Sequence, residues 1–183
     1  MEPLPSLDAG SCRLRALRVE DADAWFRLLE DPVLRRLTSW SIGSVDEVRE
    51  LIVDLTQGAR AATTRRWAIE RDGQFVGTCG FKHWDRAART AEVAYELAAG
   101  LRRQGLMRAV FGVVLRHGWA ALSLERVSAV VMEDNVASQR LLEGAGFRRT
   151  ARLPAFRVCG GRLRDFHRFE CLRPSAAEPT MAR

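Results

Sequence analysis

Apolar residues along this chain follow two different spacings. A recurrence every three to four residues, typical of a helix with one buried face, predicts four helices. They span residues 20–31, 44–55, 105–122 and 135–147. Ser44 and Glu47 form a capping box at the start of the second helix, and Asn135 is a suitable cap for the fourth. Pro32 ends the first helix, because proline removes a helical hydrogen bond.

The other apolar segments alternate with polar residues or run continuously, as strands do. The predicted strands span residues 12–19, 67–70, 74–82, 90–100, 126–132 and 164–172. Asp72 and Gly73 form the turn of a hairpin between the second and third. This order of elements predicts an α+β fold, a mixed sheet with helices on its faces. We expect residues 1–12 to form a flexible leader, residues 13–173 a single domain and residues 174–183 a disordered tail.

Length and composition narrow the class of protein. A chain of 183 residues, 47% of them hydrophobic, suits one domain with its own core. No apolar run approaches the roughly 18 residues of a membrane span, and the N-terminus lacks the pattern of a secretory signal. We therefore expect a cytoplasmic protein that does not contact a membrane. The four cysteines are scattered without a CxxC pair, so we expect neither a metal site nor a disulfide framework.

The net charge of +6 raises the question of nucleic-acid binding. Lys82 is the only lysine, and the arginines are spread along the chain among Asp and Glu residues. A dispersed excess of positive charge is weaker evidence than a basic stripe with stacking aromatic residues. Nucleic acid is therefore an unlikely main partner, and a local arginine cluster fits an anionic cofactor equally well.

The connection after the strand at residues 90–100 is the first candidate site. A helix begins there near Gly105, and the first N–H groups of a helix have no partner within it. Together with the helix dipole they bind phosphate groups, and Arg102 and Arg103 add positive charge. The alternative is a plain connection with solvated arginines. Neither a Walker loop nor a GxGxxG motif is present, which argues against a nucleotide triphosphate or a dinucleotide.

Several motifs of this sequence, in order, resemble those of the GNAT N-acetyltransferase superfamily. Residues 102–107, RRQGLM, are similar to its (Q/R)xxGx(G/A) loop. A second signature, NxxSxRxLExxGF, is complete in Asn135, Ser138, Arg140, Leu142, Glu143, Gly146 and Phe147. The segments AEVAYEL, DGQFVGTCGF and GGRLRDFHRFE also fit. The similarity covers residues 13–172 and is closest to the RimJ/RimL-like branch, the ribosomal-protein N-terminal acetyltransferases.

This resemblance implies a fold and a cosubstrate. The fold is a mostly antiparallel seven-stranded sheet with about four helices and a splay between the fourth and fifth strands. The cosubstrate is acetyl-CoA, with coenzyme A as product. The residues that match cofactor-binding positions are Tyr95, Glu96, Leu97, Arg102, Arg103, Gln104, Gly105, Leu106, Met107, Arg108, Asn135 and Ser138. Met107 departs from the family pattern of Gly or Ala, and it either crowds the phosphates or packs into the core.

The resemblance also implies direct attack of an amine on the thioester. Many relatives place a tyrosine where Leu142 stands, and in the RimJ/RimL-like branch a serine matching Ser138 protonates the leaving thiolate. The alternative for Ser138 is an ordinary helical serine near the cofactor. A carboxylate is a plausible base for the amine, and Glu92 is the first candidate and Glu96 the second. His83 is the third, although a lone histidine is more often structural.

The acceptor is the least defined part of the prediction. By analogy it binds between the first two helices and the sheet, where Trp40, His83 and Trp84 are the expected substrate contacts. Core packing is the alternative for Trp84, as it is for Trp67. Both a protein N-terminus and a small-molecule amine fit as acceptor, and a homodimer is possible. A second function is a GNAT-fold coenzyme A-binding or regulatory module without catalysis, and a third is an RNA- or ribosome-associated basic protein.

Overall fold

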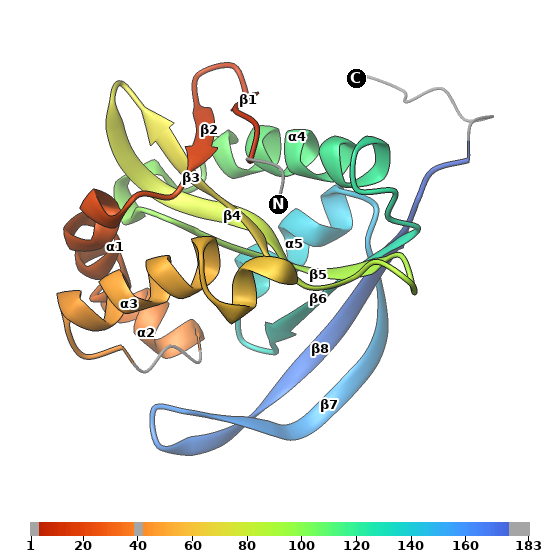
Figure 1. Cartoon of the computed structure of the whole chain (residues 1–183). Coiled ribbons are helices and arrows are strands. Elements are labelled where there is room, and N and C mark those ends of the chain that lie inside the picture. The colour runs from red at the N-terminus through yellow and green to blue at the C-terminus, as the bar shows by residue number, and fades with distance from the viewer. Residues whose placement is uncertain (1–3, 39–41, 176–183) are drawn as a thin grey trace.

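The computed structural model describes residues 4–38 and 42–175, which fold around one mixed sheet (Figure 1). The strands are β1 (Leu7–Asp8), β2 (Arg13–Ala16), β3 (Arg65–Arg71), β4 (Gln74–Asp85), β5 (Thr90–Leu97), β6 (Arg126–Met132), β7 (Arg148–Cys159) and β8 (Arg162–Leu172). The α-helices are α1 (Ala22–Leu29), α2 (Pro32–Leu37), α3 (Val45–Thr56), α4 (Leu106–Ala120) and α5 (Val136–Gly144). Short 3-10 helices are η1 (Val19–Asp21), η2 (Ala59–Ala62) and η3 (Ala99–Leu101).

The sheet has the strand order β1-β2-β3-β4-β5-β6-β8-β7. All neighbouring strands are antiparallel except β5 and β6. Helices α1, α2 and α3 lie on one side, and α4 and α5 lie on the other (Figure 1). Each face has its own core, because side chains alternate along a strand: Trp67 packs into the α4 and α5 core, and its neighbour Ala68 into the α1 and α3 core. The α+β prediction is confirmed.

Strands β5 and β6 pair over three residues and then separate. Residues 90–92 of β5 pair with residues 126–128 of β6. Beyond these pairs β5 continues to Leu97 and β6 to Met132. The expected splay is therefore present, between β5 and β6. The sequence places it between the fourth and fifth strands, and the numbers are one higher here because the short strand β1 precedes the predicted strands.

Strand β1 lies within the segment expected to be a flexible leader. Leu7 pairs with Leu14 of β2, and the carbonyl of Pro5 accepts a hydrogen bond from the Trp67 indole at 2.8 Å. Part of residues 1–12 is thus fixed against the core. A strand of two residues has no periodicity that a sequence pattern could reveal, and it brings the sheet to eight strands rather than seven. The tail expected at residues 174–183 falls almost wholly outside the described residues.

With helix α2, the described residues contain five α-helices where about four were expected. The side chain of Asp31 accepts hydrogen bonds from the backbone N–H groups of Val33 and Leu34, at 2.7 and 3.0 Å. Pro32 stands at the first helical position, where its missing N–H costs nothing. Pro32 therefore begins a second helix as well as separating it from α1. In the described part of the chain, each helix is too short or too polar to cross a membrane.

Strands β7 and β8 form a long hairpin that extends beyond the rest of the sheet (Figure 1). No strand is predicted at β7, because its residues are mostly exposed and polar ones interrupt the apolar pattern. Its register shifts twice against β8, and Ala155 in the second irregularity has a positive φ of 47°. Such bulges bend a strand. The bend brings this part of β7 beside the space that β5 and β6 leave open, and Arg157 there reaches the cavity described next.

Candidate active site

A cavity of about 470 Å³ opens where β5 and β6 diverge. Residues from α2, α3, η2, β3, β4, β5, β6, α5, β7 and β8 line it, so it receives side chains from both faces of the sheet. Six predicted site residues reach it: His83, Glu92, Tyr95, Glu96, Asn135 and Ser138. These residues come from three elements, β4, β5 and α5, and from the N-cap of α5. The splay therefore brings the candidate acid, the candidate bases and the helix cap into one space.

Tyr95 and Ser138 are joined by a hydrogen bond in this cavity. The tyrosine hydroxyl lies 2.7 Å from the serine Oγ. The Tyr95 ring packs edge-on against Phe111 of α4, with ring centroids 5.2 Å apart. Burial raises the pKa of Tyr95 well above its ordinary value of 10, so the phenol keeps its proton at neutral pH. The tyrosine is therefore a permanent hydroxyl neighbour of the serine.

Asn135 fixes the position of Ser138. Its side-chain oxygen accepts a hydrogen bond from the Ser138 backbone N–H at 3.2 Å, which makes Asn135 the N-cap of α5. The cap uses the amide oxygen, and so the amide N–H groups are not consumed by it. One turn further along the helix, Leu142 is fully buried in the core. The serine is thus the hydroxyl that α5 presents to the cavity, while the leucine serves packing.

Glu92 sits between two basic side chains. Its carboxylate lies 2.9 Å from Lys82 Nζ and 3.6 Å from His83 Nδ1, and its side chain is 14% exposed. Lys82 is directly opposite Glu92 in the β4–β5 ladder. His83 has a left-handed backbone with φ of 52°, where the ladder is irregular, and its side chain is mostly exposed. Glu92 therefore combines partial burial with access to solvent through its neighbours.

Glu96 has a different environment on the opposite side of β5 from Tyr95. Its carboxylate accepts hydrogen bonds from Arg66 and Thr78, and all three residues are buried. The Arg66 guanidinium also donates to Thr78 Oγ1 at 2.7 Å and lies 5.2 Å from the Trp25 ring. Thr78 is the cross-strand partner of Glu96, so strand register assembles this group. Glu96 lines the cavity as one member of a buried ion pair.

The loop before α4 has the geometry of an anion site. Gly105 is the N-cap of α4, with a left-handed φ of 77°, and a Cβ at this position would meet no atom within 4 Å. Because glycine has no side chain, it leaves the first N–H groups of a 15-residue helix open to a ligand. Arg103, also left-handed with φ of 63°, and Arg108 are exposed beside them. These residues fit a diphosphate.

Two other residues of the loop hold it in shape. Arg102 donates to the Leu97 carbonyl at 3.0 Å and pairs with Asp31 at 3.1 Å. The Gln104 amide donates to the Gly100 carbonyl at 2.8 Å. Arg102 is thus engaged within the protein rather than presented to solvent. The ion pair ties the loop to the cap of α2 on the other side of the sheet.

Three predicted cofactor contacts have apolar surroundings. Leu97 and Leu106 are buried in the core, and Met107 is partly buried against it. Met107 thus packs against the core, which is one of the two alternatives expected for it. Leu97, Leu106 and Met107 can contribute backbone groups to a ligand, whereas their side chains serve the core.

The expected acceptor contacts are distributed unevenly. Trp40 lies outside the described residues. Trp84 does not reach the cavity; it packs between the guanidinium groups of Arg65 and Arg86, 4.8 and 4.5 Å from its ring centroid. Trp67 is fully buried in the core. Of the three predicted contacts, His83 is the one found at the cavity within the described part of the chain.

Sequence reasoning missed cavity residues that come from distant segments. They are Thr63 and Thr64 before β3, Arg66 in β3 and Arg157 in β7. The two arginines carry no motif, since arginine is the common basic residue throughout this chain. Among the described residues, no group of three or more His, Cys, Asp or Glu side chains is placed to hold a metal ion.

Comparison with known proteins identifies the family. The Acetyltransferase (GNAT) domain profile matches residues 12–148. The chain belongs to this family. A curated relative, the uncharacterized N-acetyltransferase YoaA of Bacillus subtilis, is 30% identical over 173 residues, covering 93% of this chain and 98% of the relative. A second, N-acetyltransferase p20 of Bacillus licheniformis, is 26% identical over 163 residues, covering 87% and 92%.

Solved structures give the same family for this GNAT acetyltransferase. Mycobacterium smegmatis RimJ in complex with CoA-disulfide is 27% identical with a TM-score of 0.81, covering 93% of this chain and 86% of that one. Spermidine N-acetyltransferase from Vibrio cholerae in complex with CoA and spermine shares the fold at 22% identity and a TM-score of 0.79, covering 88% and 95%. The predicted GNAT family with its RimJ/RimL-like branch is confirmed, as is acetyl-CoA as the cosubstrate of the family.

Proposed function

We propose that this GNAT acetyltransferase is an N-acetyltransferase, which moves the acetyl group of acetyl-CoA to a primary amine by direct attack on the thioester. One observation carries the proposal. The hydrogen-bonded hydroxyls of Tyr95 and Ser138 and the carboxylate of Glu92 line the same cavity, at the point where the sheet opens. That combination supplies a proton donor for a leaving thiolate and a proton acceptor for an amine.

The same proposal assigns residues to the cofactor. The first N–H groups of α4, at Leu106 to Arg108, with the exposed Arg103, would hold the diphosphate. The edge of β5 that β6 leaves unpaired would hold the pantetheine arm beside Tyr95. When bound, acetyl-CoA supplies a thioester that an amine can attack. Backbone N–H groups at the open edge would stabilise the negative charge that develops on the thioester oxygen.

Ser138 is the proposed proton donor to the sulfur. Tyr95, which keeps its proton, can donate its hydrogen bond to Ser138 Oγ and leave the serine proton free to point away. When Ser138 gives that proton to the thiolate, the same hydrogen bond stabilises the oxygen left behind. Solvent then returns a proton to the serine. Tyr95 acts through Ser138 and is a positioning residue in this scheme.

Glu92 is the proposed base, in preference to Glu96. A base must accept the amine proton and become neutral for part of the cycle. Neutralising Glu96 would leave the guanidinium of Arg66, which is 7% exposed, buried beside an uncharged group, and that is costly. Lys82 beside Glu92 is 30% exposed, so water can solvate its charge when the carboxylate is neutral. Glu96 in this proposal orients Arg66 and stabilises the wall of the cavity.

The alternative function is a GNAT-fold module that binds coenzyme A or regulates, and is catalytically weak or inactive. Its support was Leu142, which cannot donate a proton, and Met107, which departs from the family loop. The Tyr95–Ser138 pair provides the missing hydroxyl, and Met107 packs away from the loop surface. These contacts favour the enzyme over the module.

The test is turnover with acetyl-CoA and a panel of primary amines. Release of free thiol and the mass of the acetylated amine are measured, with coenzyme A affinity determined separately by calorimetry. We expect thiol release that depends on the amine. Tight coenzyme A binding with no acetylated product from any amine would instead support the module.

A further inference from the structure

The charged residues around the cavity are nearly all paired with one another. Among the described lining residues, four carry a guanidinium or ammonium group and two carry a carboxylate. Glu92 pairs with Lys82, and Glu96 pairs with Arg66. A third basic residue, Arg60, pairs with Asp54 at 2.9 Å. Both carboxylates of the cavity are therefore already neutralised by the protein.

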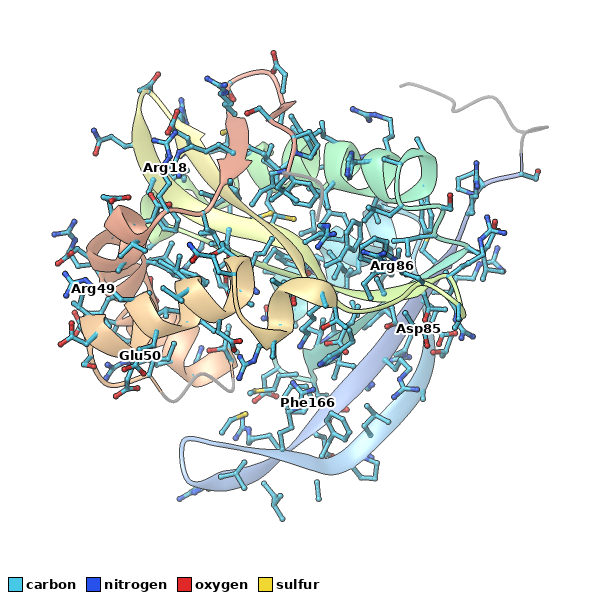
Figure 2. All side chains as sticks on the ribbon, in the orientation of Figure 1. Arg18, Arg49, Glu50, Asp85, Arg86 and Phe166 are labelled. Atoms are coloured by element: carbon cyan, nitrogen blue, oxygen red, sulfur yellow. The ribbon has the colours of Figure 1, made fainter. Side chains whose placement is uncertain are left out.

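Arg157 is the exception to this pairing. Its guanidinium lies 5.0 Å from the ring of Phe156 and 5.7 Å from that of Phe166, and the residue is partly buried. Phe166 lies where the β7–β8 hairpin leaves the body of the molecule (Figure 2). Within residues 4–38 and 42–175, no carboxylate is at ion-pair distance from Arg157. Two aromatic contacts thus hold a cation at the cavity, and the described part of the chain gives it no carboxylate partner.

Apolar side chains make up part of the cavity wall. Leu51 and Leu55 line the cavity from α3, and Met132 and Phe166 line it from β6 and β8. Such a wall favours an acceptor with an apolar part, because burying apolar surface supplies binding free energy. A planar guanidinium binds carboxylates and phosphates through two parallel hydrogen bonds, and of these the carboxylate is the group that amino acids and peptides carry.

We propose that the acceptor is a primary amine that also carries a carboxylate, and that Arg157 binds this carboxylate. The inference rests on the proposed transfer function and names the chemical class of its acceptor. The amine lies toward Glu92 and Ser138, and the apolar part lies against the α3 wall. A polyamine is disfavoured, because it would bring further positive charge to a cavity that has an excess of it.

Two sources share this chemistry. A free amino acid has its carboxylate next to the amine, and a peptide N-terminus has one when an acidic residue follows closely. The two differ in the distance between amine and carboxylate. A test with both kinds of probe therefore separates them while it tests the role of Arg157.

The experiment offers the enzyme acetyl-CoA and an equimolar pool of matched amines. Leucine and leucinamide form one pair, and the tripeptide amides Ser-Glu-Ala, Ser-Gln-Ala and Ser-Lys-Ala form a triplet, with spermidine as the polyamine. Products are quantified by mass spectrometry. If the acceptor is a free amino acid, we expect leucine to be acetylated about ten- to hundredfold more than leucinamide. If it is a peptide N-terminus, we expect the same preference for the glutamate peptide over the glutamine peptide, as for a hydrogen bond to a charged group. Equal acetylation of the members within both sets, or a preference for the lysine peptide or for spermidine, overturns the proposal.

Variants assign the preference to its residue. Arg157→Gln should bring the ratio close to one, mainly through a higher KM for the carboxylate member. The control Arg149→Gln removes the same charge from an exposed position of the same strand, outside the cavity, and should leave the ratio unchanged. Equal effects of the two variants would mean that general charge attraction, rather than Arg157, selects the acceptor.

The experiment distinguishes failure of acetyl transfer from failure of the acceptor inference. If no probe is acetylated while coenzyme A still binds, the proposed function is contradicted. The acceptor inference is then decided by calorimetry, in which each probe is titrated into the coenzyme A-loaded protein. Tighter binding of leucine than leucinamide, or of the glutamate peptide than its glutamine partner, with loss in Arg157→Gln, supports it. Equal affinities across both sets overturn it.

Discussion

The hydroxyls of Tyr95 and Ser138 lie 2.7 Å apart although 43 positions separate them in the sequence. Two features of the fold bring them together. The splay leaves the cavity side of β5 uncovered by β6, and the Asn135 cap sets the first turn of α5 above that opening. The pair is therefore a product of sheet topology and helix capping.

Removal of either hydroxyl should lower turnover. We expect Ser138→Ala to reduce kcat about a hundredfold, as for loss of a general acid, and Tyr95→Phe about tenfold, with the Kd for acetyl-CoA little changed. The double variant should be no slower than Ser138→Ala, because the tyrosine acts through the serine. Steady-state kinetics checks these values. Ser128→Ala, which alters a serine of β6 outside the cavity, is the control. If the two losses in kcat were additive in the double variant, Tyr95 would not act through Ser138.

Charge at Gly105 should control cofactor binding. Gly105→Asp places a carboxylate at the N-terminus of α4, and we expect the affinity for acetyl-CoA to fall more than about a hundredfold. Gly105→Asn has the same shape without the charge. Both side chains tolerate the left-handed backbone, and no atom within 4 Å would obstruct a Cβ. Calorimetry measures the affinities. Similar Kd values for the two variants would show that phosphate does not bind here.

The buried pair of Arg66 and Glu96 should matter for stability. Arg66→Ala leaves a buried carboxylate without its cation, and we expect a loss of about 3–5 kcal/mol in the free energy of unfolding. Replacing both residues with leucine should cost much less. Arg49→Ala breaks exposed pairs with Asp23 and Asp46 and should cost about 0–1 kcal/mol. Denaturant titration checks these differences, and an equally small loss in Arg66→Ala would rule out the assigned role.

Stability should decline on mild acidification because of His117. Burial, and secondly the charge of Arg65, lower the pKa of His117 below its ordinary value of 6.5. The unfolded chain therefore binds a proton there at a higher pH than the folded chain. Stability from the neutral ring is complete above about pH 6.5 and is lost as the pH falls below that value and through the lower pKa of the folded state. Thermal unfolding between about pH 5 and 8 should show this, less so in His117→Phe. If His117→Phe showed the same dependence of thermal stability on pH as the unaltered protein, His117 would not be its cause.

Local signals account for what the sequence predicted well. The Ser44 cap of α3, the Asn135 cap of α5 and the bounds of β6 are present as expected. Each of these depends on residues a few positions apart. Tyr95 and the six residues around Gly105 were assigned from motifs as cofactor contacts, and that role stays a prediction. The left-handed Gly105 cap of α4 is present.

Contacts between distant segments account for what was missed. The engagement of Glu96 by Arg66 depends on the register of three strands, and no pattern near Glu96 reveals it. Trp84 is a second case. Its aromatic side chain suggests a substrate contact, but in the fold it packs against the guanidinium groups of Arg65 and Arg86. Arg157 reaches the cavity because β7 bulges, and the sequence of a mostly exposed strand gives no pattern from which such a bulge could be predicted.

Tyr95 is the single tyrosine in the chain. Isotopic labelling of tyrosine therefore introduces one nuclear magnetic resonance reporter, and the fold puts it within a hydrogen bond of Ser138. Its ring signals can follow the arrival of coenzyme A, of an acceptor amine or of a proton on Ser138 without assignment of any other residue. The protein thus has a built-in spectroscopic probe at the place where the chemistry is proposed.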